Sequence, residues 1–423
     1  MARPKGQAGT IQQLGRTWRI GFWDAGPGGR RTRRWQGGFK TRTEAARALR
    51  KVLSQIDDGS YVTPRADTVG AYLRDWLEAQ RPHVAANTWV TCRNHVAYYL
   101  APSEADCATY RARTGQDRPS LAAVRLQDLT PERASRHLAE LLERGRRDGA
   151  GLRPRTVRGV RITLNAALAS AYAGGLLLRP VRVKRVAVPK RSPTIYSPEQ
   201  TGAFLAVAAG DRLAAMWVLL VTSGMRPSEV LGLPWAAVDL DAGVLSIYQK
   251  LVKVENRAVL TDGTKTDSTG GTVAQVVVLA PVAAAMLRGW RAAQLEERRL
   301  WPWRKERNDL VFTKEDGVPL KPDWLNRRFK QLACQAGLPD RVRVYDLRHG
   351  WATAALRAGV HPKLVQEVMR HSSYTTTANT YTHVMPAHSA EAVRTVATLF
   401  DRPPPQLTPG EEGRRGDSPA DGT

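Results

Sequence analysis

The sequence predicts an α+β multidomain chain: a small three-stranded sheet with one helix, then a helical bundle, then a mainly helical domain with a small antiparallel sheet. Three observations predict this class. Short β-prone runs rich in Trp and Arg fill residues 1–65. From Thr68 the apolar residues recur at the i, i+3, i+4 and i+7 spacing of an amphipathic helix. Two β-branched runs, at 244–247 and 275–279, interrupt the helical patterns that follow.

The length of the chain fits several domains. A chain of 423 residues can bury two or three separate cores, and 42% hydrophobic and 24% charged residues are typical of a globular protein. A Pro-rich, charged stretch at 184–193 predicts a linker. We therefore expect domains at 1–65, 66–185 and 190–400, and a disordered tail at 401–423 that is rich in Gly, Pro and charge.

In the first domain, the runs Trp18–Trp23 and Arg31–Trp35 flank the turn Gly26–Gly29 and predict strands. Thr43 is expected to cap a helix that begins at Glu44. The predicted unit is a three-stranded sheet with one helix.

The second domain is expected to be helical. Apolar periodicity predicts helices at 87–100, 130–147 and 153–174, with a short one near residue 120. The polar stretch 101–119 is interpreted as a loop insertion.

The third domain begins with a clear helix start, in which Ser197 is the N-cap and Pro198 the first helical residue. Further helices are expected at 211–220, at 286–307 with an extra loop, and at 387–400.

Charge points to a polyanionic partner. The formal net charge is +25, and the excess of Lys and Arg extends over all three predicted domains. Nucleic acid is the commonest partner of such a protein. The excess of Arg over Lys suits a bidentate grip on phosphate, although a GC-rich genome produces the same bias.

Several other classes are disfavoured by what the sequence does not contain. The three cysteines, Cys92, Cys107 and Cys334, are scattered, which fits a reducing cytoplasm. No signal peptide and no long apolar run predicts secretion or membrane spanning. No Walker, zinc or paired-Asp motif is present, so we expect chemistry without ATP, metal or cofactor.

Four residues in the last domain form a candidate phosphate-binding and nucleophilic set: Arg226, Arg348, His371 and Tyr381. Arg supplies planar, always-charged, bidentate donors to the oxygens of a phosphoryl group under attack. A Tyr hydroxyl can form the covalent intermediate. Its ordinary pKa is about 10, and nearby Arg and His favour the phenolate.

These residues, in this order and spacing, resemble the boxes of the tyrosine recombinases or phage-type integrases. Glu229 follows Arg226 and precedes Leu231–Trp235, as in the first box of that family. The resemblance implies that Tyr381 attacks a phosphorus, leaving a 3′-phosphotyrosine and a free 5′ hydroxyl. It also implies that Arg226 and Arg348 hold the nonbridging oxygens, that His371 adds a donor, and that Glu229 orients its neighbours.

Two positions depart from the family. Tyr345 occupies the place where the second box usually has His, and Arg370 precedes His371 where the family commonly has Gly. A phenol can donate a hydrogen bond to phosphate but cannot shuttle protons near neutral pH. We keep Tyr345 as a catalytic-site residue with its acid-base role open.

In the family, a Lys on a hairpin turn protonates the departing 5′ oxygen, and Lys265 lies on the polar stretch between the two predicted strands. An ammonium can donate a proton, which Arg cannot do at its pKa. Lys250 and Lys253 are rival candidates, and a solvated loop lysine is the plain alternative.

The resemblance also implies DNA-binding roles for the first two domains. Residues 1–65 resemble an arm-type DNA-binding domain whose sheet enters a major groove, unless its tryptophans are core and its arginines merely solvated. Residues 66–185 resemble a core-binding domain. The candidate contacts are Arg19, Arg31, Arg33 and Arg34 on the sheet, and Arg153 and Arg155 at a helix start.

The implied function is site-specific recombination for integration or excision of a mobile element. The implied partners are double-stranded DNA at core and arm sites and an accessory DNA-bending protein or excisionase. The chain is expected to form a homotetramer on that DNA, and to act in the cytoplasm at the nucleoid. The helix at 387–400 either docks on a neighbouring protomer or packs on its own domain. The alternatives are a type IB topoisomerase and a non-catalytic DNA-binding regulator with a helix-turn-helix near 361–370.

Overall fold

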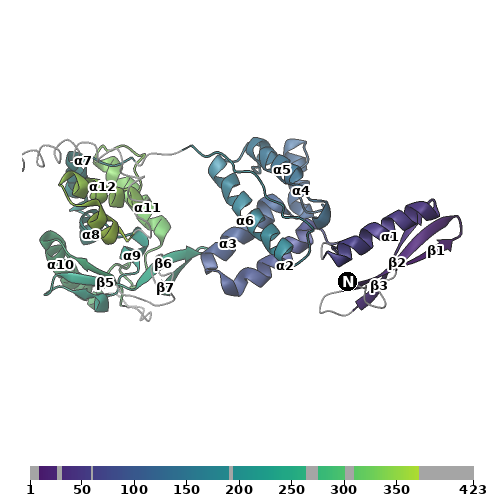
Figure 1. Ribbon diagram of the computed structural model, residues 1–423. Helices are drawn as coiled ribbons and strands as arrows, with labels where there is room; N and C mark the ends of the chain where they lie inside the picture. The colour runs from purple at the N-terminus through teal and green to yellow at the C-terminus, as the bar shows by residue number, and fades with distance from the viewer. Residues whose placement is uncertain are drawn as a thin grey trace, which may run out of the picture. The chain divides into compact units, whose positions relative to one another are not determined.

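The computed structural model divides into two compact units, Met1–Lys190 and Arg191–Thr423. It describes residues 9–25, 31–58, 61–189, 194–262, 275–300 and 309–370 (Figure 1). The predicted site residues Lys265, His371 and Tyr381 lie outside these ranges, as do the predicted helix at 387–400 and the tail at 401–423.

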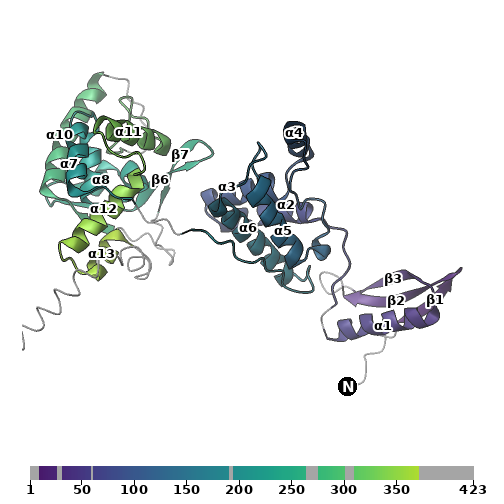
Figure 2. The ribbon, with the colours of Figure 1, turned by 90° about the horizontal axis from the view of Figure 1, so that it is seen from above.

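A three-stranded antiparallel sheet backed by one helix begins the first unit, as the sequence predicts. Figures 1 and 2 show α1 lying along one face of the sheet, whose strand order is β1-β2-β3. Ile20 and Phe22 of β2 are buried in one cluster with Leu49 of α1. The elements are β1 (Thr10–Leu14), β2 (Thr17–Ala25), β3 (Arg31–Phe39) and α1 (Arg42–Asp57).

The start of α1 corrects the sequence prediction. Thr41, not Thr43, is the N-cap residue, and its hydroxyl accepts from the backbone N–H of Glu44. The Glu44 carboxylate in turn accepts from the backbone N–H of Lys40. A Thr three residues before a Glu satisfies the first N–H groups of a helix better than Thr43 can.

A helical bundle forms the rest of the first unit. Its core is a cluster of buried side chains that includes Leu73, Leu100, Leu138 and Leu164. The helices are α2 (Val69–Gln80), α3 (Ala86–His95), a π-helical turn (Val96–Leu100), α4 (Glu104–Thr114), α5 (Pro131–Arg144) and α6 (Pro154–Ala173).

Helix α4 contradicts the prediction of a loop at 101–119. Ser103 caps the helix by accepting from the backbone N–H of Asp106, and Gly115 ends it in a left-handed conformation. Tyr110 is buried and donates its hydroxyl proton to the Arg144 carbonyl at 2.7 Å. Good caps and one buried anchor therefore outweigh the polar composition. The short helix expected near 120 appears as a 3₁₀ turn at Leu126–Asp128.

The second unit is mainly helical, with a small sheet at one side (Figure 1). Ser197 and Gln200 form a reciprocal capping box at the start of α7, which confirms the predicted helix start. The helices are α7 (Pro198–Ala208), α8 (Ala214–Thr222), α9 (Pro227–Leu231), α10 (Pro281–Leu300), α11 (Pro322–Gln335), α12 (Val344–Arg357) and α13 (Pro362–Met369). None of the helices in the described ranges is long and apolar enough to cross a membrane.

The predicted strand pair is present, and a hairpin lies between its members. β5 (Val244–Ile247) pairs antiparallel with β8 (Gln275–Val278) and with the short β4 (Val238–Asp239). The sequence reading missed β6 (Gln249–Val254) and β7 (Arg257–Asp262). Their two-residue turn, Glu255 and Asn256, has φ values of 48° and 68°, the backbone form that matches the twist of a hairpin.

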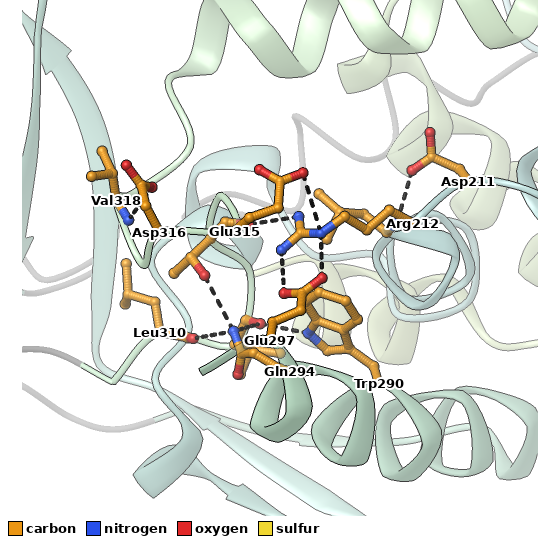
Figure 3. A network of polar contacts seen from close by, with 12 residues as sticks. Asp211, Arg212, Trp290, Gln294, Glu297, Leu310, Glu315, Asp316 and Val318 are labelled. Carbon is orange, nitrogen blue, oxygen red and sulfur yellow. Dashed lines mark hydrogen bonds and ion pairs between the residues drawn. The ribbon is translucent and has the colours of Figure 1, made fainter. Parts of the chain in front are cut away.

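A buried polar network fixes the segment that follows α9. Gln294 of α10 accepts from the Trp235 indole N–H at 2.7 Å and donates to the Leu310 and Val311 carbonyls. Arg212 binds both carboxylate oxygens of Glu297 at 2.6 Å (Figure 3). These bonds join α10 to the residues before α8, to Trp235 after α9 and to the chain around residue 311, and so fix these segments relative to one another.

Candidate active site

A glycine turn places Arg226 at the start of a helix. Gly224 has a φ of 63°, and a Cβ at this position would lie 3.0 Å from the Trp351 ring. Glycine is therefore needed both for the backbone conformation and for the close approach. Pro227 then begins α9, which leaves Arg226 as the N-cap residue.

Glu229 is the buried carboxylate at the centre of the site. Only 1% of its side chain is exposed. Its Oε1 accepts from Arg226 Nη1 at 2.7 Å, and its Oε2 accepts from the Arg226 backbone N–H at 2.8 Å. The same Oε2 accepts from Arg370 Nη2 at 2.5 Å. One carboxylate thus orients two guanidinium groups by charge-assisted hydrogen bonds.

Arg348 of α12 lies behind this pair and is 1% exposed. Its guanidinium donates to the Gly224 and Met369 carbonyls. Burial, followed by the positive charges of Arg226 and Arg370, lowers the pKa of Arg348 to about 10, although Glu229 opposes the change. Arg348 is therefore still charged at neutral pH, in a setting that stabilises a guanidinium poorly.

The carboxyl end of α13 supplies acceptors to both predicted arginines. Arg348 donates to Met369 O, and Arg226 Nη2 donates to Arg370 O at 3.0 Å. The last carbonyls of a helix lack partners within the helix and carry partial negative charge. Two guanidiniums at this end satisfy those carbonyls and fix the turn that ends the helix.

Tyr345 lies on the first turn of α12, one turn before Arg348, and is 41% exposed. Its ring is 5.4 Å from that of His349, at an interplanar angle of 69°. Burial lowers the pKa of His349. The structure thus places the Tyr345 phenol, which occupies the position where the resemblance implies His, beside the His349 imidazole.

The structure brings together Arg226, Glu229 and Arg348 from the predicted set and adds Arg370. The sequence showed Arg370 only as a departure from the family, and its contact with Glu229 had no local signal. Of the rival lysines, Lys253 is paired with Asp323 at 2.5 Å, while Lys250 lies within β6. Within the described ranges, no group of three or more His, Cys, Asp and Glu side chains is arranged to hold a metal ion.

The N-terminal sheet separates the arginines predicted to contact DNA. Arg19 and Arg33 flank the Trp35 ring, with guanidinium carbons 4.3 and 4.7 Å from its centroid. Trp35 is 42% exposed, so it is not a core residue. Arg34 pairs in register with the buried Phe22 and lies 3.4 Å from the buried carboxylate of Asp24. Because side chains alternate along a strand, Arg34 belongs to the opposite, helix-covered face.

The other predicted DNA contacts are simpler to place. The Arg31 side chain lies outside the described part of the chain. Arg153 is the N-cap residue of α6, and Arg155 follows in its first turn. Both are exposed, so a phosphate can approach either side chain.

The segment that carries this cluster also carries a family match. Residues 198–388 match the model of the phage integrase family. A tyrosine recombinase XerC-like protein of Caldanaerobacter subterraneus subsp. tengcongensis is 27% identical over 382 residues, which span 85% of this chain and 90% of that protein. The chain therefore carries a phage integrase family domain at residues 198–388. It is accordingly a tyrosine site-specific recombinase.

Further relatives agree with this family and with the fold. An integrase of Streptomyces ambofaciens is 26% identical over 82% of this recombinase and 84% of its own length. The Tn1549 transposon integrase, solved in complex with a circular intermediate DNA, superposes with a TM-score of 0.61 at 19% identity, over 77% of this chain and 99% of that one. At this identity the likeness establishes the shared α+β fold, which the sequence predicted.

Proposed function

We propose that this recombinase integrates and excises a mobile element by cutting and rejoining duplex DNA through a 3′-phosphotyrosine at Tyr381. The observation that carries the proposal is the buried cluster in which Arg226 and Arg348 converge around Glu229 and the end of α13. Such paired, fixed guanidiniums suit a phosphodiester under attack. The names of the Streptomyces integrase and of the Tn1549 transposon integrase support a mobile element as the source.

The charge of the cluster suits a phosphoryl transition state. Three guanidiniums, from Arg226, Arg348 and Arg370, surround the single carboxylate of Glu229, so two positive charges remain uncompensated. A phosphodiester brings one negative charge, and attack by a phenolate adds a second. The charge of the cluster therefore matches the doubly negative transition state better than the singly negative substrate, and such a difference is the condition for catalysis.

The two predicted arginines are poised to change partners. In the free protein, Arg226 and Arg348 donate to neutral main-chain carbonyls. A charged phosphate oxygen is a stronger acceptor than a carbonyl. We expect the nonbridging oxygens to replace some of these carbonyls when DNA binds, and the 14% exposure of the Arg226 side chain leaves it the more accessible of the two.

The chemistry assigned to the remaining motif residues follows from their types. The Tyr381 oxygen attacks phosphorus, the bond from phosphorus to the 5′ oxygen breaks, and Lys265 gives that oxygen a proton. A 5′ hydroxyl from the partner duplex then attacks the phosphotyrosine and releases Tyr381. His371 donates a hydrogen bond to the phosphoryl group, and the Tyr345 hydroxyl is proposed to donate a second one. Two rounds of exchange complete the recombination.

The DNA partners follow from the basic first unit. The exposed Trp35, flanked by Arg19 and Arg33, offers a flat cationic surface to an arm site. Arg153 and Arg155 at the start of α6 offer charge to the core site, where a helix N-terminus also favours phosphate. We propose four protomers on two duplexes, with an accessory DNA-bending protein or excisionase setting direction.

A trapping experiment tests the proposal. Sites are first enriched from a random-sequence duplex pool by rounds of binding to the full chain, and the enriched sequence is then made with a nick beside the cleaved position. We expect a covalent adduct that survives detergent with wild-type protein and with Tyr374→Phe, and none with Tyr381→Phe.

The other outcomes identify the alternatives. Binding without any adduct from the wild-type chain overturns the enzymatic proposal and favours a DNA-binding regulator. Relaxation of a supercoiled plasmid that lacks the enriched site favours a topoisomerase instead.

A further inference from the structure

Arg370 adopts a backbone conformation that suits glycine better than arginine. It ends α13 with φ 51° and ψ 47°, in the left-handed region. A residue with a Cβ is strained in that region, whereas glycine is not. The chain therefore carries a strained residue at the end of α13.

The Arg370 side chain is buried. Only 5% of it is exposed, and its Nη2 donates to Glu229 Oε2 at 2.5 Å. Its own carbonyl accepts from Arg226 Nη2 at 3.0 Å. With the bond from Arg226 Nη1 to Glu229 Oε1, these contacts close a ring through Arg226, Glu229 and Arg370.

Stability alone gives little reason for this arrangement. Among the residues that the structure describes, Arg370 Nε and Nη1 are buried without a hydrogen-bond partner, and buried unsatisfied donors destabilise a fold. Arg370 also lowers the pKa of Arg348, which shows that it repels a neighbouring cation. Strain, unsatisfied donors and repulsion all oppose folding. The clear gain is the contact with Glu229.

The contact with Arg370 limits how many hydrogen bonds Glu229 can form with the Arg226 side chain. Oε2 is shared between Arg370 and the Arg226 backbone, so only Oε1 is bound to the Arg226 side chain. Without Arg370, Oε2 keeps only the Arg226 backbone N–H, and the carboxylate can turn to form the bidentate pair that carboxylates prefer with a guanidinium. A bidentate pair would occupy the donors that Arg226 needs for phosphate.

We propose that Arg370 is a positioning residue for strand cleavage: it holds Glu229 so that Arg226 keeps donors available for the scissile phosphate. The inference rests on the proposed function. Arg370 acts through Glu229 and Arg226, because its Nη2 donates to Glu229 and its carbonyl accepts from Arg226.

The test is single-turnover adduct formation on the nicked duplex at saturating DNA. Arg370→Gly relieves the backbone strain, so we expect an unchanged or higher melting temperature. We expect adduct formation to slow by about 10- to 100-fold, the scale of a small misplacement of a catalytic group. The DNA dissociation constant should change by less than about threefold, because a change in transition-state contacts alters rate more than binding.

Three further measurements separate positioning from a general structural role. Methylguanidinium added to Arg370→Gly should restore part of the rate, and Arg370→Lys should retain more activity than Arg370→Met. Asn256→Gly relieves a left-handed residue in the β6–β7 turn, away from the cluster, and should leave the rate unchanged.

The outcomes are distinguishable. Adduct formation by Arg370→Gly at the wild-type rate overturns this inference alone, and so does a rate loss that methylguanidinium does not restore and that tracks a loss of folding. A wild-type chain that forms no adduct overturns the proposed function and the inference with it.

Discussion

Neutralising Glu229 should destabilise the second unit strongly. Glu229→Gln keeps the size and shape of the side chain but removes its charge. The amide then leaves Arg226, Arg348 and Arg370 without the carboxylate that offsets their charge. Because Glu229 is 1% exposed, water screens this change very little.

The size of the effect follows from the burial. Removing one partner of a buried ion pair costs about 3–5 kcal/mol, because the other charge is left uncompensated. For a domain of this length, each kcal/mol shifts the melting temperature by roughly 2–4 °C. We therefore expect the transition of the second unit to move down by about 6–20 °C.

Differential scanning calorimetry of the full chain measures the shift. Glu296→Gln is the matched control, since Glu296 is 63% exposed and pairs with Arg299 at 2.8 Å on the surface of α10. That pair should contribute less than about 1 kcal/mol. If Glu229→Gln melts within 2 °C of Glu296→Gln, roughly the effect of 1 kcal/mol, Glu229 does not balance the cluster.

Three other expectations follow from the structure. Burial lowers the pKa of His137 to about 4. As the pH falls from about 6.5 to about 4, His137 therefore binds a proton in the unfolded chain but not in the folded one. The free energy of unfolding of the bundle should fall by about 3 kcal/mol. Hydrogen exchange at α5 measures this loss, and His137→Gln should remove it. Trp35→Ala should weaken binding to an arm-site duplex at least tenfold without lowering the melting temperature, while Arg34→Ala should do the reverse; equal effects on binding would contradict the assignment of the two faces. Lys265→Ala should slow cleavage about 10²- to 10⁴-fold, and a 5′-bridging sulfur should restore it because a thiolate leaves without a proton, whereas Lys253→Ala should cleave normally.

Local patterns predicted much of the fold because their causes are local. The capping box at Ser197 and the β-branched runs of β5 and β8 are decided by neighbouring residues. The same rule explains the error at Thr43, because Thr41 and Glu44 carried the true signal. Helix α4 was missed since its polar sequence hides one buried anchor, Tyr110.

The site was predicted less completely because its decisive contacts are distant in sequence. The Arg226 and Glu229 pair follows from their three-residue spacing at a helix start. The contact of Arg370 with Glu229 joins residues 141 positions apart, and no local pattern encodes it. The presence of Arg at position 370, where the resemblance implies Gly, was the available signal. It indicated an added cation near the site but did not identify Glu229 as its partner.

The most direct test of the central claim is to locate the DNA on the protein. Trypsin should release one peptide, from His371 to Arg394, that contains both Tyr374 and Tyr381. Fragmentation of this peptide from the trapped adduct, by tandem mass spectrometry, shows which residue carries the nucleotide. We expect a 3′-phosphonucleotide on Tyr381. A nucleotide on Tyr374, or on any other residue, would contradict the account.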